Sequence, residues 1–242
     1  MITAILTIYN RSETLLKQIE CLNNQTIKPQ EIWIWKNKGS KDIKINVPEN
    51  VKFIESNFNF KYHSRFALAQ LVRTEYVAII DDDIFPQKKW FENCLNSIKK
   101  KDGIMCAMGV ELLEENYRPH KKYGWNNTLS EDINRVDIGC QSWFFKKTHL
   151  KFLWMEEPLT WDNGEDIQFS YLAKKYGDIN TYVPPHPENN KNVWGSEPIL
   201  GNKYGSDNNA TYRINKNHFP LRDMLCTTYI KNGWKIKRIE SK

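Results

Sequence analysis

The first half of the chain alternates short apolar runs with segments of helical periodicity. Continuous apolar runs rich in β-branched residues are typical of strands buried in a parallel sheet. The strands expected on this basis cover residues 2–8, 31–35, 51–55 and 76–80. Apolar residues three and four positions apart predict helices between them, over residues 15–22 and 63–72. This alternation predicts an α/β fold with a Rossmann-like, mostly parallel central sheet flanked by helices.

The second half of the chain is less regular. The further elements expected are helices over residues 88–101 and 166–176 and strands over residues 104–110, 136–145 and 180–183. Residues 112–135 are polar and are expected to form a loop. From residue 184 onward the sequence is rich in Pro, Asn and Gly, which predicts an irregular C-terminal segment that runs over the surface.

Composition and charge narrow the class of protein. With 40% hydrophobic and 26% charged residues among 242, the chain has enough apolar material for a single folded domain. Its net charge of +6 suits phosphate-bearing ligands, but no nucleic-acid-binding motif accompanies it. The five cysteines form no CxxC pair, which argues against a cysteine zinc site and favours a reducing compartment. Without a signal peptide or an apolar run of about 18 residues, we expect a soluble, cytoplasmic protein with at most peripheral membrane contact.

Three consecutive carboxylates, Asp81, Asp82 and Asp83, follow the fourth expected strand. They repel one another unless a positive group neutralises them, and a divalent cation does this well. Alternate residues of an extended segment point the same way, so Asp81 and Asp83 are a candidate pair of oxygen ligands for Mg²⁺ or Mn²⁺. His186, in a proline-flanked loop, is a candidate third ligand. The alternatives are an acidic loop that caps the next helix and a histidine in a surface loop.

A second acidic group, Glu165 and Asp166, opens the helix expected after it. Either carboxylate is a candidate for accepting a proton from a hydroxyl or for stabilising positive charge at a reacting carbon. Helix capping alone also explains carboxylates at this position.

Cations and aromatic rings fall near the same edge of the expected sheet. Arg11 and Arg65 are candidates for pairing with phosphate oxygens, and Arg65 is the favoured one. Trp161 and Trp194 are candidate platforms for a sugar ring, because aromatic faces pack well against sugars and bases. Surface solvation of the cations and core packing of the tryptophans are the alternatives.

In their order along the chain, five segments resemble the GT-A fold nucleotide-sugar glycosyltransferases, especially family 2. They are ILTIYNR, EIWIWKNKGS, HSRFALA, YVAIIDDD and WDNGEDIQFSYLAKKYG. The resemblance implies metal-dependent transfer of a sugar from a nucleoside-diphosphate sugar, with a uridine nucleotide favoured, to a hydroxyl of a glycan acceptor. It also implies one GT-A domain with a nucleotide-binding half (residues 1–110), an acceptor-side half (111–186) and a covering C-terminal segment (187–242).

The resemblance also assigns roles to residues. Those implied to bind the donor nucleotide sugar are Thr7, Tyr9, Arg11, Asn37, Arg65, Asp81 and Asp82. Asn37 stands where the family often has Asp. Asp81 is implied to approach the ribose, and Asp83 to hold Mn²⁺ or Mg²⁺ on the diphosphate, with His186 completing the coordination. In inverting relatives the second residue of the Glu-Asp pair is the general base, which here is Asp166, next to Glu165.

Other functions and stereochemistries remain open at this stage. WIWKNKGS, the segment around Arg65, IIDDD and IGCQSWFF also resemble the exostosin-type glycosyltransferases, which retain anomeric configuration. Inversion is preferred and retention stays possible. A nucleotidyltransferase acting on sugar phosphates is an alternative, although such enzymes have a Gly-rich loop where this chain has IYNRSET. A non-catalytic carbohydrate-binding module is the third possibility.

Overall fold

A single mixed sheet forms the centre of the molecule. The computed structural model describes residues 1–39, 46–49, 51–124, 128–208 and 210–240. Its strands are β1 (Ile2–Ile8), β2 (Glu31–Lys36), β3 (Val51–Glu55), β4 (Tyr76–Ile80), β5 (Gly103–Leu112), β6 (His120–Tyr123), β7 (Asn134–Val136), β8 (Ile138–Lys146) and β9 (Asn180–Val183). They lie in the order β3-β2-β1-β4-β8-β5-β9-β7, and β6 pairs with β5.

The strand directions explain where the ligand edge lies. β1 pairs in parallel with β2 and β4, and β2 pairs in parallel with β3. β8 runs antiparallel between β4 and β5, and β9 is parallel to β5. β1, β2, β3, β4, β5 and β9 therefore share one direction, which confirms the expected mostly parallel sheet. The carboxyl ends of β1, β2 and β4 meet at one edge of the sheet, as required for a site between them.

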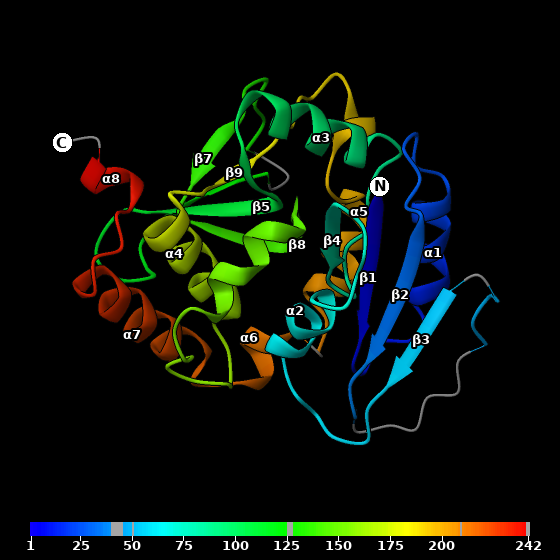
Figure 1. The fold of residues 1–242 in the computed structure, drawn as a ribbon, viewed down its shortest axis with the longest axis horizontal. Coiled ribbons are helices and arrows are strands. Elements are labelled where there is room, and N and C mark those ends of the chain that lie inside the picture. The colour runs from blue at the N-terminus through cyan, green and yellow to red at the C-terminus, as the bar shows by residue number, and fades with distance from the viewer. Residues whose placement is uncertain (40–45, 50, 125–127, 209, 241–242) are drawn as a thin grey trace.

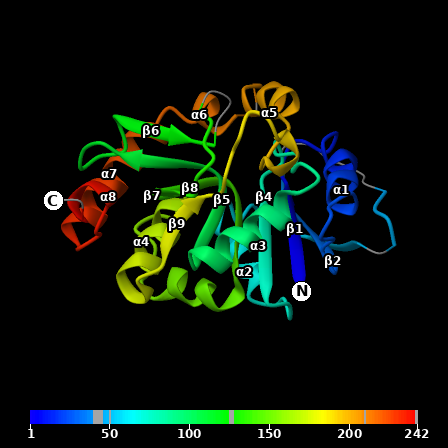
Figure 2. The same ribbon diagram turned by 90° about the horizontal axis from the view of Figure 1, so that it is seen from above.

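Helices cover both faces of the sheet. They are α1 (Leu15–Asn23), α2 (His63–Ala69), α3 (Trp90–Lys100), α4 (Glu165–Gly177), α5 (Pro198–Gly205), α6 (Thr211–Ile214), α7 (His218–Lys231) and α8 (Lys237–Glu240), with 3₁₀ turns η1 (Lys147–Trp154) and η2 (Lys191–Val193). Helices α1 and α3 pack on one face of the parallel strands, and α2, η1 and α4 pack on the other. The strands β1–β3 lie at one end of the molecule and α7 and α8 at the other (Figures 1 and 2).

The parallel strands are buried because their apolar runs fill both layers between sheet and helices. Ile5 and Ile79 pack with α2 and α4 on one side, and Leu6 and Ile80 pack with α1 and α3 on the other. All four side chains have no exposed surface. Residues on both faces of a strand must be apolar in such a sheet, which is why these strands could be predicted from continuous runs.

Two expectations about irregular segments were wrong. Residues 112–135, expected to be a loop, include the strands β6 and β7. The C-terminal segment, expected to be irregular, is largely helical among its described residues. Helix α7 forms there because it buries one side against α4, where the rings of Tyr229 and Tyr171 stack at 4.4 Å. Among the described helices, none combines the length and apolarity needed to cross a membrane.

Gly164, directly before α4, lies where the start of this helix packs closely against α7. Its φ is +91°, and a Cβ placed there would lie 2.2 Å from Leu225 Cδ1 of α7. We expect Gly164→Ala to lower the free energy of unfolding by roughly 2–4 kcal/mol, because backbone strain and overpacking act together. Gly233→Ala is the matched control, since Gly233 has φ +96° with no other atom within 4 Å of an added Cβ. Urea unfolding of both variants measures the difference, and equal losses would contradict the contribution of Leu225.

Candidate active site

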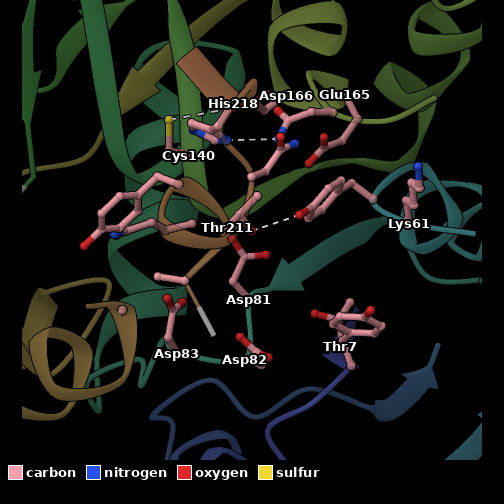
Figure 3. A pocket seen from close by; sticks show the side chains of 18 of the residues that line it. Thr7, Lys61, Asp81, Asp82, Asp83, Cys140, Glu165, Asp166, Thr211 and His218 are labelled. Carbon is pink, nitrogen blue, oxygen red and sulfur yellow. Dashed lines mark hydrogen bonds between the residues drawn. The ribbon is translucent and has the colours of Figure 1, made fainter. Parts of the chain in front are cut away.

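A cavity of about 840 Å³ lies at the carboxyl edge of the parallel strands. Its walls come from the ends of β1, β2 and β4, the start of α4, and the segment from α5 to α7. In Figure 3, Asp81, Asp82 and Asp83 lie on one side of the cavity, Glu165, Asp166 and His218 lie on the opposite side, and Thr211 lies between them. The cavity therefore brings together the two acidic groups predicted from the sequence.

The three consecutive aspartates have different partners. Asp81 is ion-paired with Arg65 of α2, and Asp82 is ion-paired with Arg11 at 2.6 Å. Asp83 is in no ion pair with a lysine or arginine within the part of the chain that the structure describes. Asp83 is thus the member of the triplet with a carboxylate left for another cation.

Negative charge exceeds positive charge around the triplet. Burial raises the pKa of Asp81 to about 8, because the pairing with Arg65 only partly offsets burial and the neighbouring carboxylates. Burial and the charge of Asp82 raise the pKa of Asp83 to about 7, against the opposing effect of Arg11. Both carboxyl groups therefore take up a proton unless a further cation is present.

These raised pKa values predict a pH-dependent stability of the metal-free protein. Between the ordinary carboxyl pKa and about 8, the native state holds protons on Asp81 and Asp83 that the unfolded chain has released. The free energy of unfolding must therefore fall as pH rises from about 7 to 8.5, a window above the ordinary histidine pKa. Urea unfolding in EDTA measures this fall. Asp83→Asn should make the fall smaller, and a stability that rises over this window would contradict the assignment.

The two arginines predicted to bind phosphate are held by carboxylates. Arg11 donates to both oxygens of Asp207, at 2.9 and 2.6 Å, in addition to its contact with Asp82. Arg65 bridges Asp81 and Glu165, with a 2.7 Å ion pair to Glu165. Each guanidinium still lines the cavity, but it is shared between two acids.

The nucleotide side of the cavity contains the other predicted donor residues. Thr7 and Tyr9 line it from the end of β1. Asn37 lines it too, but its amide is used by the neighbouring loop: Nδ2 donates to the Lys61 carbonyl at 3.0 Å, and Oδ1 accepts from the Phe60 N–H at 3.2 Å. Asn37 therefore holds the backbone of residues 60–61, of which Lys61 lines the cavity.

Asp166 is held by an arginine that the sequence analysis did not identify. Arg222 of α7 donates to Asp166 Oδ1 at 3.0 Å and to Oδ2 at 2.7 Å, and both residues are buried. Burial alone would raise the pKa of Asp166, but the charge and hydrogen bonds of Arg222 bring this pKa below its usual value. The Ile167 N–H and, at 3.9 Å, the Cys140 thiol also donate to this carboxylate. Asp166 is thus ionised and fixed in orientation at neutral pH.

His186 and Trp194 do not have the places predicted for them. The His186 ring stacks on Trp194 with centroids 4.1 Å apart, and both line a separate small cavity of about 20 Å³. Burial lowers the pKa of His186 to about 4. Within the described ranges, no group of three or more His, Cys, Asp or Glu residues is arranged to hold a metal. The structure therefore does not bring His186 together with Asp81 and Asp83. The His186 ring instead stacks on Trp194.

The two candidate tryptophan platforms differ in exposure. Trp194 is 4% exposed and its indole N–H donates to the Pro187 carbonyl at 2.7 Å, so its buried ring has no face left for a sugar. Trp161 is 52% exposed and its ring meets His63 edge to face. It is next to Asp162, which lines the cavity. The role of Trp161 stays a prediction.

Several cavity residues were missed by the sequence analysis, and some of them come from α6 and α7. Examples are Thr211, His218 and Arg222. A signal for α7 was present, because its buried residues Arg222, Leu225, Cys226 and Tyr229 have the spacing of one helical face. No local signal pairs Arg222 with Asp166, which is 56 residues away.

Comparison with known proteins decides the family. The sequence profile described as glycosyl transferase family 2 matches residues 3–152, more than half of the chain. The chain belongs to glycosyl transferase family 2. This membership favours the first of the two resemblances found in the sequence.

Solved structures support the fold. S. aureus TarS is similar with a TM-score of 0.53 and 13% identity, over 76% of this chain and 36% of that one. The structure of S. aureus TarS 1-349 gives a TM-score of 0.51 and 14% identity, over 76% and 60% of the two chains. At these identities the likeness shows the fold alone. The chain spans less than two thirds of the length of both TarS structures. No curated protein matches the chain.

Proposed function

We propose that this glycosyltransferase transfers a sugar from a nucleoside-diphosphate sugar, with a uridine nucleotide favoured, to a hydroxyl of a glycan acceptor in a metal-dependent reaction. The observation that carries the proposal is the cavity itself. It has the Asp81–Asp83 triplet on one side and the ionised Asp166 on the other. A donor diphosphate next to the triplet and an acceptor hydroxyl next to Asp166 place the reacting carbon between them.

A divalent cation fits the triplet side of the cavity. Among the described residues, the guanidiniums of Arg11 and Arg65 lie among five carboxylates, those of Asp81, Asp82, Asp83, Glu165 and Asp207. A diphosphate would add further negative charge. Mg²⁺ and Mn²⁺ are commonly held by one or two carboxylates together with substrate phosphates, and Asp83, with Asp81 beside it, provides such a set. When bound, the cation would offset the charge that develops on the departing nucleoside diphosphate.

Asp166 is the proposed general base of an inverting displacement. Its ionised carboxylate can accept the proton of the acceptor hydroxyl as the oxygen attacks the sugar carbon. Oδ1 accepts from Arg222 and from the Ile167 N–H, and Oδ2 accepts from Arg222 at 2.7 Å and from the Cys140 thiol at 3.9 Å. Glu165 instead positions Arg65, whose other partner is Asp81.

Product analysis tests the proposed function. We expect release of nucleoside diphosphate from one member of a panel of uridine and other nucleotide sugars, in the presence of Mn²⁺ or Mg²⁺ and a glycan mixture, and loss of this release in EDTA. Proton spectra of the first product should show inverted anomeric configuration. Full activity in EDTA would contradict the metal, and a retained anomer would contradict the role of Asp166 as base.

A further inference from the structure

Four aromatic rings line the end of the cavity beyond Asp166. Tyr117 precedes β6, His120 is its first residue, and His218 and Phe219 come from the start of α7. The ring centroids are 4.7 Å apart for Tyr117–His120, 6.5 Å for Tyr117–Phe219 and 4.9 Å for His218–Phe219. We call these residues the four-ring cluster. Its members line the same cavity as the triplet and Asp166.

The hydrogen bonds around His218 fix the position of its proton. Arg222 has only donors, so the Asn163 atom that it contacts at 3.1 Å must be the carbonyl oxygen Oδ1. The amide nitrogen of Asn163 then faces His218 Nδ1, at 3.2 Å, and must be the donor. Because Nδ1 accepts, a neutral His218 carries its proton on Nε2. Burial lowers the pKa of His218 to about 4, which keeps the ring neutral.

His120 has the opposite arrangement. Its Nδ1 lies 2.8 Å from the Tyr117 carbonyl, and a carbonyl oxygen can only accept. Nδ1 of His120 must therefore carry the proton, which leaves a lone pair on Nε2. Burial lowers the pKa of this ring as well. The four-ring cluster thus has one imidazole N–H donor, at His218 Nε2, and one imidazole acceptor, at His120 Nε2.

We propose that the four-ring cluster is a subsite for a sugar unit of the acceptor, in which His218 Nε2 donates to one sugar oxygen and His120 Nε2 accepts from a hydroxyl. Sugar hydroxyls both donate and accept, whereas a fully ionised anion such as sulfate only accepts and would meet the lone pair of His120 unfavourably. Phe219, whose side chain is half-buried, provides apolar ring surface for the C–H face of the sugar, and the buried Tyr117 ring packs behind it. The proposal rests on the proposed function for its assignment to the acceptor.

The tautomers are tested first, in the whole chain with ¹⁵N-labelled histidine. Long-range proton–nitrogen spectra at about pH 7.5, above the ordinary histidine pKa, should show the proton of His218 on Nε2 and that of His120 on Nδ1. His218→Gln and His120→Gln assign the two rings, each by the loss of one set of signals. Asn163→Asp removes the donor to His218 and should move its proton to Nδ1, while the His120 signals stay unchanged. A wild-type His218 with its proton on Nδ1 would overturn the proposal.

The ligand class is tested by titration with simple probes. Methyl glycosides of glucose, galactose and N-acetylglucosamine are added to roughly 100 mM, above the millimolar affinity of weak sites. At least one should shift the ring signals of both His120 and His218, and the shift should be lost in Phe219→Ala. Inorganic sulfate, which is fully ionised and only accepts hydrogen bonds, should not compete at the same concentration. The absence of any glycoside-induced shift, or a shift caused by sulfate instead, would contradict the proposal.

These measurements are independent of donor chemistry. Neither needs a nucleotide or a metal, so a failed metal-dependent activity with intact glycoside shifts would overturn the proposed function and leave the sugar subsite standing. In turnover assays His218→Gln, which keeps an N–H donor, should raise the acceptor KM less than His218→Phe, with the donor KM unchanged in both. Equal acceptor KM values in the two variants would show that His218 donates no hydrogen bond to the acceptor.

Discussion

Replacement of Asp83 by Asn is expected to lower the rate of glycosyl transfer by about 10³-fold while the protein stays folded. Asp83 is the carboxylate of the triplet without an arginine or lysine partner among the described residues. A bound cation stabilises leaving-group charge by several kcal/mol, which corresponds to roughly this factor. The free energy of unfolding should not decrease at about pH 8, because the substitution removes negative charge from a cluster that has too much of it.

The effect of Asp83→Asn is measured as initial rates with saturating nucleotide sugar and Mn²⁺. Asp162→Asn is the matched control: this carboxylate also lines the cavity, but its side chain is 62% exposed. The control should keep most of the wild-type rate, since exposed ion pairs contribute little. An Asp83→Asn variant with the wild-type rate would show that this residue holds no catalytic cation.

Replacement of Arg222 by Met is expected to destabilise the protein by about 3–5 kcal/mol. Arg222 is 5% exposed and holds both oxygens of Asp166, which is 6% exposed. Removing one partner of a buried pair leaves the other charge without compensation, and this accounts for the size of the loss. The double variant Asp166→Asn with Arg222→Met should lose less stability than Arg222→Met alone, because no buried charge then remains unpaired.

Urea unfolding measures both Arg222 variants, and the pH dependence of the rate adds a second readout. In the wild type, Arg222 counteracts the burial that would raise the pKa of Asp166. Without Arg222 that pKa must rise, so the acid side of the pH–rate profile should move to higher pH in Arg222→Met, and less so in Arg222→Lys. A double variant no more stable than the single one, together with an unmoved profile, would contradict the account of this pair.

The parallel half of the fold could be predicted from the sequence because each strand carries its own signal. Continuous apolar runs such as residues 2–8 and 76–80 specify buried strands, and their ends place the Asp81–Asp83 triplet at the ligand edge. Helix α7 was missed although Leu225, Cys226 and Tyr229 are spaced helically. A buried Arg222 on the same face hides the apolar stripe.

The partners of the site residues could not be predicted, because they depend on contacts between distant segments. Arg65 was expected at a phosphate, yet it lies between Asp81 and Glu165, which are 16 and 100 residues away. His186 was expected at the triplet, yet the folding of the chain after β9 stacks it on Trp194. The types of the site residues and their positions after the strands thus predicted where the cavity lies. Which charged residues pair inside it could be seen only in the folded structure.

The central claim, that the triplet side of the cavity binds a nucleoside diphosphate through a divalent cation, is tested most directly by thermal unfolding with nucleotides. A ligand that binds only the native state raises the unfolding temperature. We predict that UDP raises it in the presence of Mn²⁺, that EDTA removes this rise, and that Asp83→Asn shows none. An equal rise in EDTA would contradict the cation, and no rise with any nucleoside diphosphate would contradict the donor site itself.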